Sequence, residues 1–149
     1  FILMSLRPAD ANGQYQNSEA GNIASLSNTL FLEYALSGYS LTPDVVEAAL
    51  IADFKLYAGW ASTDTQDRGL TTIVDGTQVL TFAEWGIVEP VIRAHCELIQ
   101  ANRMEGTGSL GGERFGLSVS EASPMYVEAK ERMKSESFVE DVLFIPCGS

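Results

Sequence analysis

The feature that most constrains this chain is a long apolar segment, which predicts a helix from residue 43 to about residue 61. Thr42 is a good N-cap residue, and Pro43 suits the first helical position. The segment that follows, residues 45–61, carries only three charged side chains: Glu47, Asp53 and Lys55. A helix that is apolar on nearly every side must be covered on nearly every side. The sequence leaves open whether the rest of the chain or a neighbouring subunit supplies this cover.

A β-hairpin is predicted after this helix. Residues 70–74 and 77–81 are rich in β-branched side chains, and Asp75-Gly76 separates them. Asp-Gly suits a type I′ turn, in which both central residues have a positive φ. Because an isolated two-stranded hairpin is marginally stable in water, we expect it to pack on helices or to pair with strands of another chain.

A second long helix is predicted to begin at the end of the hairpin and to run to about Met104. Thr81 and Glu84 match a capping box, in which each side chain bonds a backbone amide of the other residue. Pro90 lacks a backbone N–H and is expected to kink this helix or to divide it at Glu89.

Two shorter helices complete the expected core. One covers residues 28–37, capped by Asn28 and stopped by Gly38, and the other runs from Ser123 and Pro124 to about residue 135. We therefore predict a mainly α fold, a bundle of three to four helices with one β-hairpin, in a single domain. Its parts are an irregular N-terminal arm at 1–24, a helical core at 25–136 with the hairpin at 70–81, a glycine-rich loop at 105–123 and an extended or strand-like C-terminal tail at 137–149.

The charge balance and the cysteines restrict the partners. Twenty acidic residues against 9 basic residues give a net charge of −11, which disfavours specific nucleic-acid binding but would let DNA slide past. No stretch is long and apolar enough to suggest a membrane span.

Cys96 and Cys147 lack zinc-like spacing, and we interpret both as free thiols. Met4 follows three apolar residues and is interpreted as the original start, the alternative being a processed precursor.

A search for catalytic chemistry predicts no enzyme, no cofactor and no metal site. His95 is the only histidine, and we interpret it as a helix-surface residue. The glycine motif at 106–111 follows a predicted helix rather than a strand, so a flexible loop is the better interpretation than a dinucleotide site. Four aromatic residues are interpreted as core or interface anchors, with a ligand pocket as the alternative: Tyr57, Trp60, Trp85 and Tyr126.

The order of predicted elements resembles that of the head-to-tail connector (adaptor) proteins of tailed bacteriophages. The resemblance is carried by the apolar helix 42–60, the hairpin 70–81 and the capped helix 81–104, which together cover less than half of the chain. It implies a structural virion protein of the phage neck, assembled in the host cytoplasm, without catalytic residues. The implied partners are copies of the chain in a closed ring of about twelve, the portal protein and further neck or tail proteins, with DNA only passing through the channel.

If the chain is such a subunit, its interface is expected to involve the apolar helix, the hairpin and the tail. The residues proposed for it are Leu50, Phe54, Tyr57, Trp60, Ile73, Val79, Phe138, Val142, Phe144 and Ile145. Two alternatives remain open from the sequence. One is a small helical enzyme or ligand-binding protein, and the other is a cytosolic regulator that binds another protein.

Overall fold

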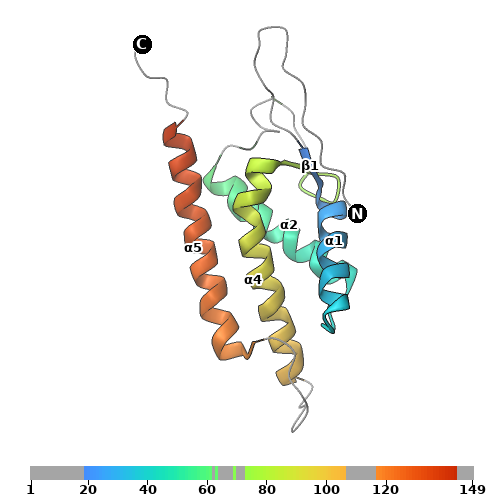
Figure 1. The fold of residues 1–149 in the computed structure, drawn as a ribbon. Helices are drawn as coiled ribbons and strands as arrows, with labels where there is room; N and C mark the ends of the chain where they lie inside the picture. Colours follow the sequence, from blue (N-terminus) through green and yellow to red (C-terminus); the bar gives the residue numbers. More distant parts are fainter. Residues whose placement is uncertain (1–18, 62, 64–68, 70–72, 107–116, 144–149) are drawn as a thin grey trace, which may run out of the picture.

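The computed structural model describes residues 19–61, 63, 69, 73–106 and 117–143 (Figure 1). The predicted fold class is confirmed, because the described chain is mainly helical and contains one two-stranded antiparallel sheet. The elements in chain order are β1 (Glu19–Asn22), α1 (Ile23–Leu36), α2 (Pro43–Trp60), β2 (Val79–Thr81), α4 (Phe82–Gly106) and α5 (Val119–Leu143).

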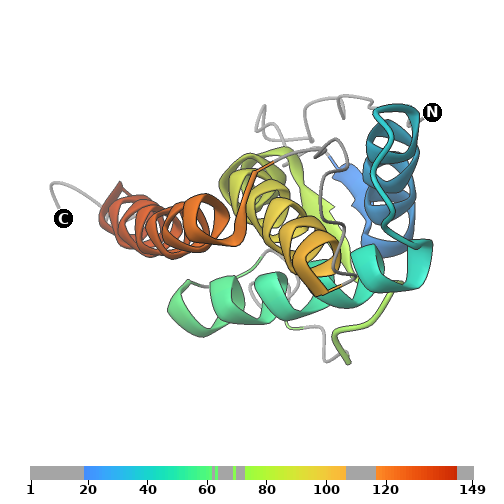
Figure 2. The ribbon, with the colours of Figure 1, turned by 90° about the horizontal axis from the view of Figure 1, so that it is seen from below.

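Helix α4 is the centre of the bundle. Seen along its axis, α5 and α1 lie on its two sides and α2 crosses beneath it (Figure 2). The core is formed where these helices meet, and its largest members include Leu30 of α1, Phe54 and Tyr57 of α2 and Ile92 of α4. The chain itself therefore covers one side of the apolar helix α2. The opposite side stays uncovered in the described structure: Leu56 is 38 % exposed, and Ala48, Ala52 and Gly59 are exposed as well.

The sheet pairs segments that are far apart in the sequence. Strand β2 pairs with β1, whereas Ile73 and Val74 form no strand and residues 70–72 lie outside the described residues. The expected type I′ turn is wrong, because Gly76 does not have a positive φ. The Gly76 carbonyl instead accepts a hydrogen bond from the amide of Ala24 at 2.9 Å. The turn thus docks on the start of α1, and β1 takes the place expected for residues 70–74.

The predicted starts of the two long central helices are confirmed. The Thr42 hydroxyl accepts from the Val45 amide at the start of α2. At the start of α4, the Thr81 amide donates to Glu84 at 2.9 Å and the Glu84 amide donates to Thr81 at 3.2 Å. Helix α4 continues through Pro90, so the expected division at Glu89 is wrong. Buried side chains on both sides of Pro90, such as Val88 and Val91, hold the helix in the core.

Helix α1 begins earlier than predicted. Its N-cap is Asn22, whose side chain accepts from the Ser25 amide at 2.8 Å, and not Asn28. Residues 19–24 therefore belong to β1 and α1 rather than to an irregular arm, while residues 1–18 lie outside the described residues. Gly38 ends the helix as predicted, with a φ of 90° that L side chains rarely adopt.

Helix α5 is longer than predicted at both ends. It begins at Val119, because the side chain of Glu121 accepts from the Ser118 amide at 3.2 Å and the Ser118 carbonyl accepts from Ala122. Glu121 thus makes the carboxylate half of a capping box, and the Ser118 hydroxyl donates to the same carboxylate at 2.8 Å. The Ser-x-x-Glu spacing at 118–121 was the sequence signal for this start. The helix extends to Leu143, so the expectation of an extended segment from residue 138 is wrong for 138–143. Residues 144–149 lie outside the described residues.

Candidate functional site

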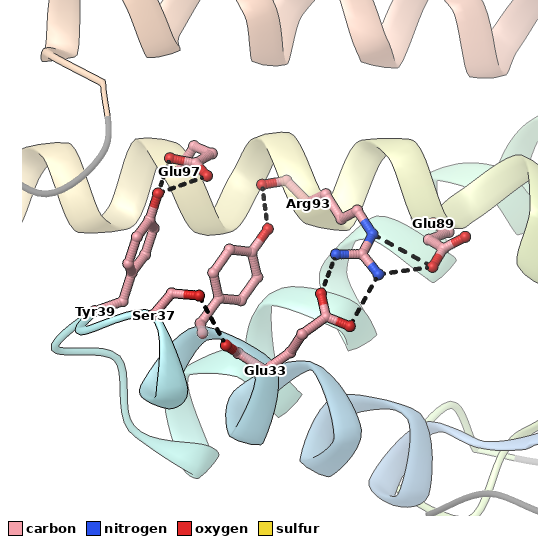
Figure 3. Close-up of polar contacts among 7 residues, drawn as sticks. Glu33, Ser37, Tyr39, Glu89, Arg93 and Glu97 are labelled. Carbon is pink, nitrogen blue, oxygen red and sulfur yellow. Dashed lines mark hydrogen bonds and ion pairs between the residues drawn. The ribbon is translucent and has the colours of Figure 1, made fainter.

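An open groove runs along α4, between α1 on one side and α5 on the other. Figure 3 shows this face of α4 with its two neighbours. The groove has a volume of about 390 Å³. We call it the α4 groove. Its lining residues are Tyr34, Pro90, Arg93, Ala94, Glu97, Met125, Glu128, Ala129 and Arg132.

The Arg93 guanidinium in this groove is already paired. It donates to Glu33 of α1 at 2.5 Å and to Glu89 of α4 at 3.0 Å (Figure 3). The hydrogen bond from Arg93 lowers the pKa of the Glu33 carboxyl, and the same bond raises the pKa of Arg93. Arg93 therefore links α1 to α4 and is committed to carboxylates of its own chain.

The other charged residues of the groove also have partners within the chain. The Tyr39 hydroxyl donates to Glu97 at 2.9 Å, and burial followed by this bond raises the pKa of Tyr39 to about 12. Arg132 pairs with Glu128 at 3.1 Å, one turn away on α5. With these charges paired, the rest of the lining is largely apolar and suits an apolar side chain better than a free anion.

A second polar cluster joins three helices on the α2 side of α4. We call it the Asp53 junction, and it consists of Asp53, His95 and Tyr126. Asp53 of α2 is fully buried, and His95 Nδ1 of α4 lies 3.0 Å from its Oδ2. The Tyr126 hydroxyl of α5 donates to Asp53 Oδ1 at 2.8 Å, and the rings of His95 and Tyr126 stack with centroids 4.5 Å apart.

The Asp53 junction corrects the interpretation of His95 as a helix-surface residue. Its side chain is 20 % exposed and hydrogen-bonded to a buried carboxylate. Burial and then the Asp53 carboxylate raise the pKa of Tyr126, so this hydroxyl keeps the proton that it donates. Within the described residues, no group of three or more His, Cys, Asp or Glu side chains could hold a metal ion. The sequence signal was the place of Asp53 on the apolar face of its helix, three or four positions from Leu50 and Tyr57, where a carboxylate needs a buried partner.

The residues expected at an interface fall into three groups. Leu50, Phe54 and Tyr57 are at most 1 % exposed, because they pack in the core of the chain itself. Trp60 is half-buried, whereas Ile73 and Val79 are 80 % and 37 % exposed. The remaining four lie where the structure describes no side chains: Phe138, Val142, Phe144 and Ile145.

The structure also shows exposed apolar side chains that the sequence analysis did not select. Leu32 and Leu36 of α1 are 47 % and 90 % exposed, and Ala35 between them is exposed as well. We call these three residues the leucine patch. Met125 and Val127 of α5 are 49 % and 54 % exposed. The exposure of Leu36 is notable because a large apolar side chain gains free energy when it is removed from water.

Comparisons with protein families, with curated proteins and with solved structures found no match to this chain. Among the described residues, no helix has the length and hydropathy needed to cross a membrane. Of the glycine motif at 106–111, only Gly106 is described, and it ends α4.

Proposed function

We propose that this chain is a structural subunit of a bacteriophage virion, a head-to-tail adaptor that assembles as a ring between the portal and the tail. In this role the chain binds copies of itself, the portal protein and further neck or tail proteins, and DNA passes through the ring without specific contacts.

The observation that carries the proposal is the α4 groove together with the leucine patch. The groove offers an apolar surface whose charges are paired, and the patch offers large exposed apolar side chains. Surfaces of this kind favour contact with protein over binding of a charged small molecule. The net charge of −11 further supports a channel wall along which DNA can move without being held.

The test is to purify the full chain with the portal protein encoded in the same genome. Light scattering and negative-stain imaging are expected to reveal a ring of this chain attached to the portal. A chain that remains a monomer and does not bind the portal would overturn the proposal.

The Asp53 junction favours a second candidate function, a small enzyme in which His95 acts as a general base. A buried aspartate that orients the Nδ1 side of a histidine is one way to prepare its other nitrogen for proton transfer. The discriminating variant is His95→Ala. The adaptor function predicts that this variant still folds and still binds the portal. The enzyme function predicts that a hydrolytic activity of the wild-type chain is lost in the variant.

A further inference from the structure

We propose that Asp75 is a site of covalent self-modification, at which its side chain reacts with the nitrogen of Gly76 and the peptide bond between the two residues becomes an isoaspartyl bond. The fold suppresses this reaction while the turn at 75–78 is docked on the start of α1, and the reaction proceeds when the turn opens. It needs no partner molecule, so it is independent of the adaptor role.

The chemistry involves only water and the atoms of Asp75 and Gly76. The Gly76 nitrogen attacks the side-chain carboxyl carbon of Asp75 and forms a C–N bond, and the carboxyl hydroxyl leaves with the amide proton as water. The product is a succinimide ring. Water then adds to one of the ring carbonyls. Addition at the main-chain carbonyl breaks the original peptide bond, so the main chain now runs through the side chain and is one carbon longer.

The sequence at this turn favours the reaction. Glycine follows Asp75, and it has no side chain to hinder ring closure at its nitrogen. Asp75 is exposed, so water can reach the ring. The structure also gives a reason for glycine at this position. A Cβ at Gly76 would lie 2.5 Å from Oε1 of Glu47, so a larger residue would have to displace the Glu47 side chain.

Thr77 holds the Asp75 carboxylate in an unreactive state. Oδ1 of Asp75 accepts from the Thr77 amide at 2.8 Å and from the Thr77 hydroxyl at 2.6 Å. The bond from the hydroxyl and then the bond from the amide lower the pKa of the Asp75 carboxyl. Without its proton the carboxyl oxygen cannot leave as water. Ring closure also requires the carboxyl group to turn toward the Gly76 nitrogen, away from Thr77.

The backbone of the turn is held as well. The Asp75 carbonyl, which would become part of the ring, accepts from the Gln78 amide at 3.1 Å. The Gly76 carbonyl accepts from Ala24 and the Gln78 carbonyl accepts from Ile23, both at 2.9 Å. Ring closure rotates the backbone between Asp75 and Gly76, so these bonds must open first. The rate of isomerisation is therefore set by the fraction of time in which the turn is open.

The experiment measures isoaspartate at residue 75 after the full chain has been incubated at neutral pH, either folded or in urea. Labelling with protein isoaspartyl methyltransferase and peptide mapping quantify the modified fraction. Thr77→Val removes the hydroxyl that binds Asp75. Thr29→Val is the matched control, because it removes a hydroxyl that donates to the Ser25 carbonyl of α1, away from the turn. Asp75→Glu abolishes the signal, since the longer side chain does not close this ring.

We expect isomerisation at residue 75 to be at least about tenfold faster in urea than in the folded chain. In the folded state Thr77→Val is expected to raise the rate about threefold or more, because a charged group loses one hydrogen bond. Thr29→Val should leave the rate unchanged, and circular dichroism verifies that both variants fold. Equal rates in the folded and unfolded chains, or equal rates for the two threonine variants, would overturn the proposal. So would an unfolded chain without isoaspartate at residue 75.

The isomerised chain is expected to lose the docked turn. Its main chain is one carbon longer between Asp75 and Gly76, so the Gly76 carbonyl no longer meets the Ala24 amide. Hydrogen exchange at the Ala24 amide is therefore expected to be faster in the isomerised fraction than in the unmodified chain. An Ala24 amide that is equally protected in both would overturn the link between the reaction and the docking of the turn.

Discussion

At the scale of single residues, Asp53 is the most demanding position in the described chain. A fully buried carboxylate is costly unless hydrogen bonds or a charge compensate it, and Asp53 obtains its partners from two other helices. The Asp53 junction therefore links both α4 and α5 to α2.

We expect Tyr126→Phe to lower the free energy of unfolding by about 1–3 kcal/mol, because it leaves a buried carboxylate short of one donor. Tyr39→Phe is the matched control, since it also removes a hydroxyl that donates to a carboxylate. Glu97, however, is half-buried and can take up water instead. Urea unfolding followed by circular dichroism measures both variants, and a loss for Tyr39→Phe as large as that for Tyr126→Phe would contradict the prediction.

The thiol of Cys96 is expected to make the free energy of unfolding depend on pH in the alkaline range. Burial, and then the charge of Asp53, raise the pKa of its thiol from 9.0 to about 12. Between these values the folded chain keeps a proton that the unfolded chain has lost, so the free energy of unfolding falls as the pH rises through this window. The buried hydroxyls of Tyr34 and Tyr126, whose pKa values are also raised, act in the same direction.

Urea unfolding at pH 8 and at pH 10.5 is therefore expected to give a lower stability at the higher pH. The Cys96→Ala variant should lose less between the two pH values than the wild-type chain. A free energy of unfolding that is higher at pH 10.5 than at pH 8 would contradict this prediction.

At the scale of elements, the two central helices differ in how their starts are protected. Thr42 caps α2 at an exposed position, whereas Thr81 and Glu84 form a capping box that is almost fully buried. We expect Thr42→Ala to cost about 1 kcal/mol and Thr81→Ala to cost up to about 2 kcal/mol, since the second also leaves a buried amide without its acceptor.

Thermal or urea unfolding of the two variants measures this difference. A double-mutant cycle with Glu84→Ala is expected to give a favourable coupling energy between Thr81 and Glu84. A double variant whose loss of stability equals the sum of the two single losses would contradict the reciprocal hydrogen bonds between Thr81 and Glu84.

The elements predicted correctly from the sequence are those whose boundaries depend on neighbouring residues. The caps of α2 and α4 and the stop at Gly38 involve contacts within four positions, and such contacts are visible in the sequence. The start of α1 was missed because Asn22 and Asn28 are equally good caps. The choice between them depends on β1, whose pairing with β2 connects residues about sixty positions apart.

The candidate site was less predictable than the fold for the same reason. The α4 groove and the Asp53 junction bring together side chains from three helices that are distant in the sequence. The place of Asp53 among the apolar positions of its helix is visible in the sequence, but its partners His95 and Tyr126 are not, because they lie on other helices. The exposure of Leu36 depends equally on which side of α1 turns toward α4.

At the scale of the whole molecule, the net charge of −11 opposes any assembly of copies. Salt shortens the range of this repulsion to about 10 Å at 0.1 M and less at higher concentration. Because this repulsion opposes the proposed ring, we expect self-association to strengthen when the salt concentration is raised from 0.05 to about 0.5 M.

Sedimentation equilibrium at the two salt concentrations measures this effect. Self-association that weakens as salt is added would indicate a contact made by ion pairs and would contradict this prediction.

The pairing of β1 with β2 also bears on the continuity of the chain. Backbone bonds from Ile23 to Gln78 and from Ala24 to Gly76 connect the first half of the fold to the second, and the core side chains of α2 pack against α4. A polypeptide that ends after Ala61 and another that begins at Ile73 therefore hold complementary parts of one sheet and one core. The two fragments, made separately, are therefore expected to associate and to restore the fold.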